Sequence, residues 1–425
     1  MLAPYRNILR VNGAARFSAI GLLARLPTAM IVLAIILFVS AQTDSFAVAG
    51  AMTAAFQISA SSVTIVSSRI ADRLGQARVL PVLCLVNALF TIMFVISMQR
   101  DMPLVISGML IAFAGAFMPA IGSMIRARWA HLTSGDDLRT AFAMESTFDE
   151  IDWTIGPLLT ALLAAALDPA APLIAAAAMT AVFGLALASL RASQPAPSPA
   201  RPRHDRSGLL RNGLPVVVVT LAGVGVMFGA YEVAVPAFAA AQGAPNASGL
   251  VLAAWAVGSM IGGLWFGTRR WSASLPRQAQ LAIGFMALAI IPGLINHSIA
   301  VSLAAAFLAG VAIAPSLITQ FSLAERLVDS DRITEGITWA MSGITLGFAA
   351  GSALSGALID IWGVRAGFAV ALTGAVIAFA LAWCFRDHLE RHMRHGQEPA
   401  AFAAGWDPVP GPVPGSFDNS DSNPR

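Results

Sequence analysis

Residues 17–41 read FSAIGLLARLPTAMIVLAIILFVSA, an unbroken apolar run in which Arg25 is the only charged residue. A helix needs about 20 predominantly apolar residues to cross the roughly 30 Å hydrocarbon core of a bilayer. The run is also longer than the about 7–15 apolar residues of a signal peptide. We therefore interpret this stretch as a retained membrane span rather than a cleaved leader.

The rest of the chain has the same character. Of its 425 residues, 57 % are hydrophobic and 12 % are charged, whereas soluble domains carry about 25 % charged residues. The apolar runs predict twelve spans, at residues 17–41, 46–67, 79–98, 103–125, 140–166, 172–190, 214–240, 248–267, 278–296, 299–322, 334–359 and 366–385. Each must be helical, because lipid offers backbone groups no hydrogen-bond partners. The composition predicts an all-α membrane protein and excludes a secreted disulfide scaffold, a nucleic-acid binder and an ordinary soluble enzyme.

The distribution of arginine predicts the orientation. All 26 basic residues are arginine, and an even number of spans places both termini on one side. If that side is the cytoplasm, only Arg100 and Arg365 face outward, and Arg25 lies within a span. Cytoplasmic loops carry the excess of positive charge. We therefore expect a multi-pass protein of a bacterial-type inner (plasma) membrane with cytoplasmic termini.

The chain divides into two similar halves. Residues 191–212 are rich in proline, serine and arginine and predict a cytoplasmic linker between six-helix bundles at 1–190 and 213–386. The polar tail, 387–425, predicts disorder. Equivalent positions in the two halves carry similar residues: Gly50 and Gly249, Phe56 and Trp255, Gly115 and Gly310, Pro119 and Pro315. A repeat of this kind is typical of duplicated transporters and predicts two pseudo-symmetric bundles.

The loop after the second span, residues 68–78, reads SRIADRLGQAR. It resembles the signature of the major facilitator superfamily, in which a glycine precedes aspartate–basic–x–glycine and further basic residues. The matching residues are Asp72, Arg73, Gly75 and Arg78, whereas Ser68, Gln76 and Ala77 depart from the pattern. The resemblance covers about residues 15–386. It implies two six-helix bundles around a central cavity that opens alternately to each side of the membrane.

Asp72 stands at the end of a predicted helix, where it can pair with arginines and with the backbone of the eleventh span. We expect it to latch the cytoplasmic face closed, with Gly75 allowing the tight turn. Alternatively, Arg73 and Arg78 only anchor the topology. Glu335, at the start of the eleventh span, is either part of this gate or an anchor at the membrane interface.

The fifth predicted span carries four carboxylates, Glu145, Asp149, Glu150 and Asp152. Their spacing places Glu145, Asp149 and Asp152 on one helical face, with Glu150 about 100° away. Four carboxylates cannot all stay ionised in a medium of low dielectric constant. We expect some of them to be protonated, as a proton-coupled carrier requires.

Arg25 provides a partner for this acidic face. It lies nine residues from Arg16, and Asp149 lies nine from Thr140, so both are about 14 Å from the same membrane surface. We expect Arg25 to pair with Asp149 or Glu150, either at the cytoplasmic end of the cavity or as a structural ion pair. Glu145, placed nearer the end of the span, is expected at the interface beside Arg126 or Arg128.

Two further motifs lie within spans. Glu232, followed by Pro236, is a candidate for substrate or proton binding, and the alternative is a hydrogen bond to Tyr231 or to a neighbouring span. Gly156 and Pro157 resemble a fragment of the superfamily's antiporter motif. Their alternative role is a helix bend and close packing between helices.

No motif indicates an enzyme. The chain has no GxxxxGK[ST] sequence to hold ATP phosphates, its histidines are scattered, and we expect neither a metal nor a cofactor. The sequence predicts a monomeric carrier that exports a small amphipathic molecule, cationic or neutral, in exchange for protons. The alternatives are a proton-coupled uptake symporter and a non-transporting receptor or scaffold with the same fold.

Overall fold

Helices form nearly all of the computed structural model, which describes residues 6, 8–11, 13–197, 213–269, 271–295, 297–328 and 333–395. Within these residues, eleven helical segments are long and apolar enough to cross a membrane. A further helix, α7 (Gly135–Ala166), is long enough but contains the acidic residues of the fifth predicted span. Together they account for the twelve predicted spans of an all-α membrane protein.

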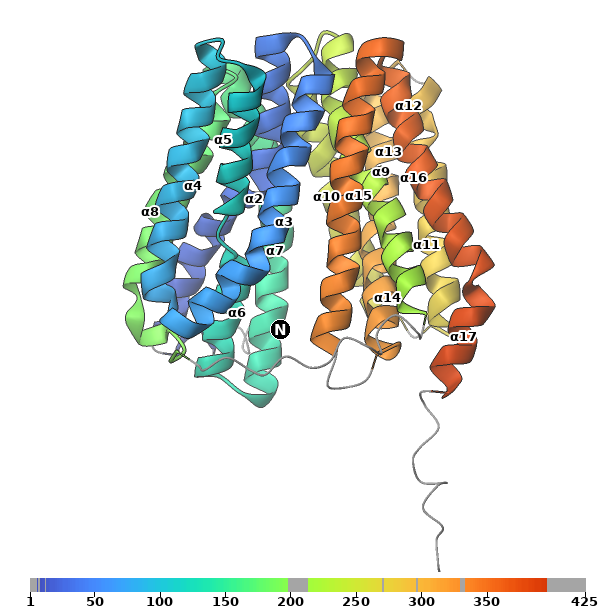
Figure 1. Cartoon of the computed structure of the whole chain (residues 1–425). Coiled ribbons are helices and arrows are strands. Elements are labelled where there is room, and N and C mark those ends of the chain that lie inside the picture. The colour runs from blue at the N-terminus through green and yellow to red at the C-terminus, as the bar shows by residue number, and fades with distance from the viewer. Residues whose placement is uncertain are drawn as a thin grey trace, which may run out of the picture.

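The helices fall into two halves (Figure 1). The N-terminal half consists of α2 (Ala14–Thr43), α3 (Phe46–Leu74), α4 (Gln76–Gln99), α5 (Leu104–Ala116), α6 (Ile121–Leu132), α7 and α8 (Ala171–Ser189), followed by the short turn η1 (Arg191–Ser193). The C-terminal half consists of α9 (Leu214–Ala241), α10 (Ala247–Thr268), α11 (Leu275–Ile290), α12 (Pro292–Ile295), α13 (Ile299–Val311), α14 (Ile313–Arg326), α15 (Ile333–Trp362) and α16 (Val364–Cys384).

The fourth and tenth spans, predicted as single helices, are interrupted in the structure. The break between α5 and α6 contains Pro119, and α13 is separated from α14 at Ala312. Proline cannot donate a backbone hydrogen bond, which explains the first break. Just before each break a glycine packs on a helix two spans earlier: a Cβ at Gly115 would overlap the Phe56 carbonyl of α3, and one at Gly310 would overlap the Trp255 carbonyl of α10. The internal repeat aligns Gly115 with Gly310 and Phe56 with Trp255, so the same contact occurs at equivalent positions of the two halves.

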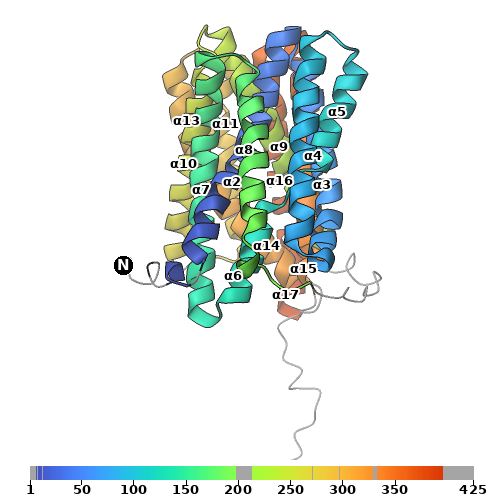
Figure 2. The ribbon, with the colours of Figure 1, turned by 90° about the vertical axis from the view of Figure 1, so that its left-hand side faces the viewer.

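The two ends of the bundle differ in charge. We call the end with the α3–α4, α6–α7 and α10–α11 junctions the arginine-rich end, and the opposite end, with Arg100 and Arg365, the arginine-poor end. In Figure 1 the arginine-rich end is at the bottom, where the chain enters and leaves the bundle, and this end is also at the bottom of Figure 2, which views the molecule from the side of the N-terminal half.

Apolar packing distinguishes these ends more sharply. Toward the arginine-poor end, one buried cluster includes residues of both halves, such as Ile35 and Phe38 of α2 and Val233 of α9. Toward the arginine-rich end, there are two clusters, one around Trp129 in the N-terminal half and one around Leu323 in the C-terminal half. The halves are therefore joined at the arginine-poor end and packed separately at the other.

The start of the predicted tail differs from expectation. Residues 386–395 form helix α17 (Arg386–His395) instead of a disordered segment. Leu389 is buried in a cluster with Leu214 and Leu327, and Glu390 accepts a hydrogen bond from Ser274 at 2.5 Å. These anchors explain why the helix forms in a polar sequence. The rest of the predicted tail, 396–425, and the linker residues 198–212 lie outside the described part of the chain.

Candidate functional site

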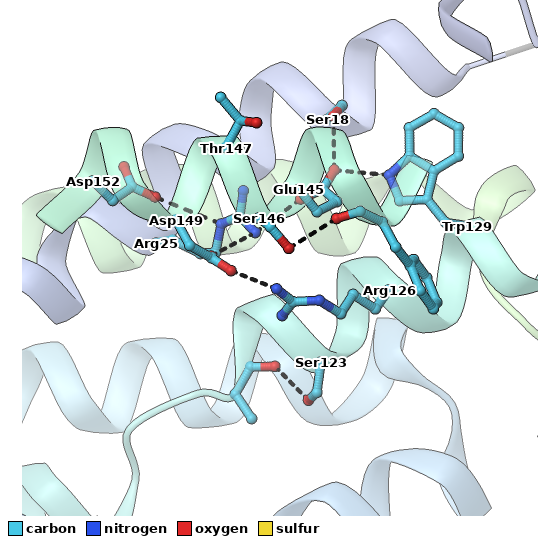
Figure 3. Close-up of polar contacts among 12 residues, drawn as sticks. Ser18, Arg25, Ser123, Arg126, Trp129, Glu145, Ser146, Thr147, Asp149 and Asp152 are labelled. Carbon is cyan, nitrogen blue, oxygen red and sulfur yellow. Dashed lines mark hydrogen bonds and ion pairs between the residues drawn. The ribbon is translucent and has the colours of Figure 1, made fainter. Parts of the chain in front are cut away.

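Three of the four carboxylates predicted in the fifth span meet Arg25 between α2 and α7 (Figure 3). Close packing brings these helices together one turn beyond the charges. A Cβ at Gly156 would lie 2.7 Å from the Ala29 Cβ, and the Thr160 hydroxyl donates to the Met30 carbonyl at 3.4 Å. Pro157 presents its carbonyl oxygen to Gly249 of α10. Gly156 and Pro157 thus pack α7 against both α2 and α10, as the packing interpretation predicted.

Arg25 faces three carboxylates on one face of α7. Its Nη1 lies 2.8 Å from Glu145 Oε2 and 3.1 Å from Asp149 Oδ1, and its Nε lies 3.6 Å from Asp152 Oδ2. The Arg25 side chain is only 6 % exposed. We call Arg25, Glu145, Asp149, Asp152 and Arg126 the Arg25 cluster. The predicted common face of the carboxylates and the Arg25–Asp149 pair are both present, whereas the alternative pair with Glu150 is not.

Glu145 is the most deeply held member. Its side chain is completely buried, and its Oε1 accepts hydrogen bonds from Ser18 Oγ at 3.0 Å and from Trp129 Nε1 at 2.7 Å. The expectation that Glu145 lies at the interface beside Arg126 or Arg128 is wrong. Helix α7 begins at Gly135, before the predicted start of the span, and both α2 and α6 cover this face.

Asp149 is the solvent-accessible carboxylate of the cluster, with a side chain that is 33 % exposed. It bridges Arg25 to Arg126 of α6, whose guanidinium donates to Asp149 Oδ2. Arg126 is therefore part of the cluster, through Asp149 rather than through Glu145. A carboxylate with one arginine on each side and contact with solvent can exchange ions or protons without unpacking the helices.

Asp152 is buried but weakly held. Its Oδ2 accepts no hydrogen bond, and the Nη2 of Arg25 donates none, within the described residues. The cluster contains three carboxylates and two guanidinium groups. If every carboxylate were ionised, the cluster would carry a net negative charge in a low-dielectric region, which is costly. Glu145 Oε2 likewise accepts no hydrogen bond from the described residues, but it lies 2.8 Å from Arg25, whereas Asp152 Oδ2 lies 3.6 Å away, so Asp152 is the better placed of the two to hold a proton.

Two other candidates stand apart from the cluster. The Glu150 carboxylate, expected as an alternative partner of Arg25, forms no ion pair or hydrogen bond with any residue that the structure describes. Glu232 of α9 is half-buried and likewise has no partner in the described part of the chain. The alternative bond between Glu232 and Tyr231 is not formed, because the Tyr231 ring packs 4.9 Å from Trp255 and 5.9 Å from Phe368.

The signature loop lies at the arginine-rich end between α3 and α4. Gly75 has a φ of +86°, so this turn requires glycine. Asp72, Arg73 and Arg78 are exposed, and Asp72 forms no ion pair or hydrogen bond with the described residues. The latch stays a prediction, because the side chains at the start of α15, where its partners are expected, lie outside the described part. Glu335 lies in the first turn of α15, and its side chain is outside the described part.

Comparison with known proteins decides the family. The sequence profile of the Major Facilitator Superfamily matches residues 17–295 and 269–412, which is most of the chain. The chain belongs to the Major Facilitator Superfamily. As a member of this superfamily (MFS), it is a transporter and not an enzyme.

Solved structures of transporters share the fold of this MFS protein. A variant of the nucleoside transporter NupG has a TM-score of 0.70 and 15 % identity and covers 89 % of this chain and 100 % of its own. A bacterial homologue of the iron transporter ferroportin, in an inward-facing state, has a TM-score of 0.64 and 18 % identity over 87 % of this chain and 99 % of its own. An auto-inhibited POT family peptide transporter has a TM-score of 0.67 and 13 % identity over 89 % of this chain and 96 % of its own. No curated protein matched the sequence.

Sequence reasoning missed the importance of Arg128 in this MFS protein. The side chain is completely buried and donates to the carbonyls of Leu187 and Leu190 at 2.9 and 3.0 Å and to Ser193 Oγ at 2.8 Å. It also donates to Gln76 Oε1 at 2.9 Å. These carbonyls end α8, where the helix dipole favours a cation. Gln76, which departs from the basic residue of the signature, thus links the loop to Arg128.

Metal binding finds no support in the described residues. Among them, no group of three or more histidine, cysteine, aspartate and glutamate side chains is arranged to hold a metal ion. The carboxylates of the Arg25 cluster face guanidinium groups instead. The cluster is suited to moving a proton or to balancing the charge of a substrate.

Proposed function

We propose that this MFS transporter works as a monomer that exports a small amphipathic molecule, cationic or neutral, in exchange for protons. The observation that carries the proposal is the surplus carboxylate of the Arg25 cluster. Three carboxylates face two guanidinium groups, and the Asp152 Oδ2 accepts no hydrogen bond from the described residues. A proton on Asp152 balances the charges, and its release leaves one negative charge in the membrane.

This charge provides a coupling principle. A carboxylate that is protonated in one step and ionised in another changes the net charge of the cluster without changing its helices. An ionised cluster favours a nearby cation, and a protonated cluster does not. Glu232, half-buried and without a described partner, is the candidate in the C-terminal half for direct contact with the substrate.

The orientation follows from arginine. We place the arginine-rich end in the cytoplasm of a bacterial-type inner membrane, in line with the positive-inside rule. The arginine-poor end, where the two halves share one apolar cluster, then faces outward. With this orientation, the separate packing of the two halves at the arginine-rich end supports assignment of the structure to an inward-facing state of an alternating-access cycle, from which an exporter takes its substrate.

Inverted membrane vesicles test the coupling. Vesicles from overproducing cells are energised with lactate, and their acidification is followed by quenching of acridine fluorescence. Ethidium and tetraphenylphosphonium serve as amphipathic cations, together with compounds that differ between deletion and overexpression strains in sensitivity and metabolite comparisons. We expect at least one compound to restore fluorescence in vesicles with the unaltered protein, because its entry releases protons, and not in vesicles with Asp152→Asn.

Asp168→Asn is the matched control. Asp168 is exposed in the α7–α8 loop, and its carboxylate accepts only a local hydrogen bond from the Ala170 amide at 2.8 Å. This variant should release protons like the unaltered protein. Proton release by Asp152→Asn at the unaltered rate would refute the assignment. Proton-driven accumulation in right-side-out vesicles would support the uptake symporter instead, and binding without proton movement would support the receptor.

A further inference from the structure

Helices α3 and α15 end with the same short pattern at opposite ends of the bundle. Helix α3 ends in Asp72-Arg-Leu-Gly75 at the arginine-rich end, and α15 ends in Asp360-Ile-Trp-Gly363 at the arginine-poor end. Gly75 and Gly363 have φ values of +86° and +81°. The two helices are antiparallel neighbours from different halves, so the carboxyl end of each lies beside the amino end of the other.

At the arginine-poor end, Asp360 caps α3 from the other half of the molecule. Its carboxylate accepts hydrogen bonds from the amides of Phe46 at 2.9 Å and Ala47 at 3.0 Å, and from Ser45 Oγ at 2.5 Å. Ser45 Oγ in turn accepts from the Val48 amide at 3.1 Å. The first amides of a helix have no partners within it, and here the second half of the protein supplies two of the acceptors. A negative charge at this helix end is also favoured by the helix dipole.

The backbones around this cap touch directly. A Cβ at Gly50 of α3 would overlap the carbonyl of Ser352, and a Cβ at Gly356 of α15 would overlap the carbonyl of Phe46. The backbones of α3 and α15 are therefore in contact at this end, and the hydrogen bonds of Asp360 are 2.5–3.0 Å long. Even a small separation of the two helices would lengthen these bonds beyond hydrogen-bonding distance. Any separation of the two halves at this end therefore breaks the bonds of Asp360.

We propose that Asp360 is the latch of the arginine-poor gate, which holds this end closed and releases the α3 amides when it opens. This inference rests on the alternating access of the proposed function and not on proton coupling or on the direction of transport. Asp72 has the same position on the partner helix, at the opposite end of the bundle. Asp360 is thus a positioning residue that sets the balance between the two states.

Distance measurements between spin labels test the latch without a substrate or a proton gradient. Nitroxides are attached at Met102→Cys and Ile295→Cys, in a background with Cys84→Ala and Cys384→Ser. Met102 and Ile295 are exposed at the arginine-poor end, one in each half. In lipid nanodiscs, the unaltered protein should give one dominant distance. Asp360→Asn and Asp360→Ala should add a longer distance and raise the ratio of open to closed molecules about tenfold, equivalent to about 1.4 kcal/mol.

Two controls separate the latch from general destabilisation. Asp168→Asn removes an exposed carboxylate from the same end that bonds within its own half, and its distances should match those of the unaltered protein. Ser45→Ala keeps the two amide bonds to Asp360 and should give a smaller shift. Unchanged distances in both Asp360 variants would overturn the proposal. Loss of folded protein in both would also overturn it, because a latch that opens in every cycle cannot be essential for folding.

Discussion

Replacing Arg25 by methionine tests how the Arg25 cluster is held together. Methionine has a similar length but no charge, so Glu145 and Asp152 stay buried without a cation within 4 Å, since Arg126 contacts only Asp149. Removing one partner of a buried ion pair costs about 3–5 kcal/mol, because the remaining charge is uncompensated. We expect Arg25→Met to reduce the free energy of unfolding by this amount.

Glu145→Gln should cost less, about 1–3 kcal/mol. The amide oxygen can still accept from Ser18 and Trp129, and two carboxylates still face Arg25. In the double variant the buried charge of Glu145 is absent as well as that of Arg25. The double variant should therefore be more stable than the sum of the single changes predicts, with a coupling free energy of about 1–3 kcal/mol.

Equilibrium unfolding in mixed dodecyl-maltoside and dodecyl-sulfate micelles, followed by far-ultraviolet circular dichroism, measures these free energies. Arg100→Met is the control, because Arg100 is exposed at the arginine-poor end and has no ion pair in the described residues; it should cause no measurable change. If the effects of Arg25→Met and Glu145→Gln add to within about 0.5 kcal/mol, the two side chains act independently and the reasoning about the cluster is refuted.

The same unfolding assay checks two further changes. Gly156→Ala should cost about 1–3 kcal/mol through overpacking against α2, whereas Gly267→Ala, with no atom within 4 Å of the added methyl group, should cost far less; equal effects would show that α2 and α7 do not approach closely. Arg128→Gln should cost about 2–4 kcal/mol, because the last carbonyls of α8 and Gln76 lose a charged donor. A stability unchanged by this substitution would mean that water replaces the guanidinium.

The spans and the Arg25–Asp149 pair could be predicted because both depend on distance along helices. The length of an apolar run fixes where a helix crosses, and equal depth from one membrane surface brings Arg25 and Asp149 together. The position of Glu145 could not be predicted in this way. It depends on where α7 begins beyond the membrane and on the packing of Ser18 and Trp129 over its carboxylate.

Contacts between the halves were beyond prediction for a different reason. Asp360 and Phe46 are far apart in the sequence, and no spacing rule connects them. The only signal was the repeated Asp-x-x-Gly pattern, which becomes informative once α3 and α15 are known to be neighbours. Arg128 was missed because it lies just past the predicted end of its span, at a position typical of a topology anchor.

The single apolar cluster that joins the halves has a thermodynamic consequence. Opening the arginine-poor end exposes part of this cluster to water, and closing the other end covers the partly buried hydrophobic side chains that pack against the two smaller clusters. Apolar hydration carries a large heat capacity, so the difference in heat capacity between the two states reports how far these areas cancel. If the apolar surface exposed at one end exceeds that covered at the other, cooling weakens the apolar contact between the halves and populates the state that is open at the arginine-poor end.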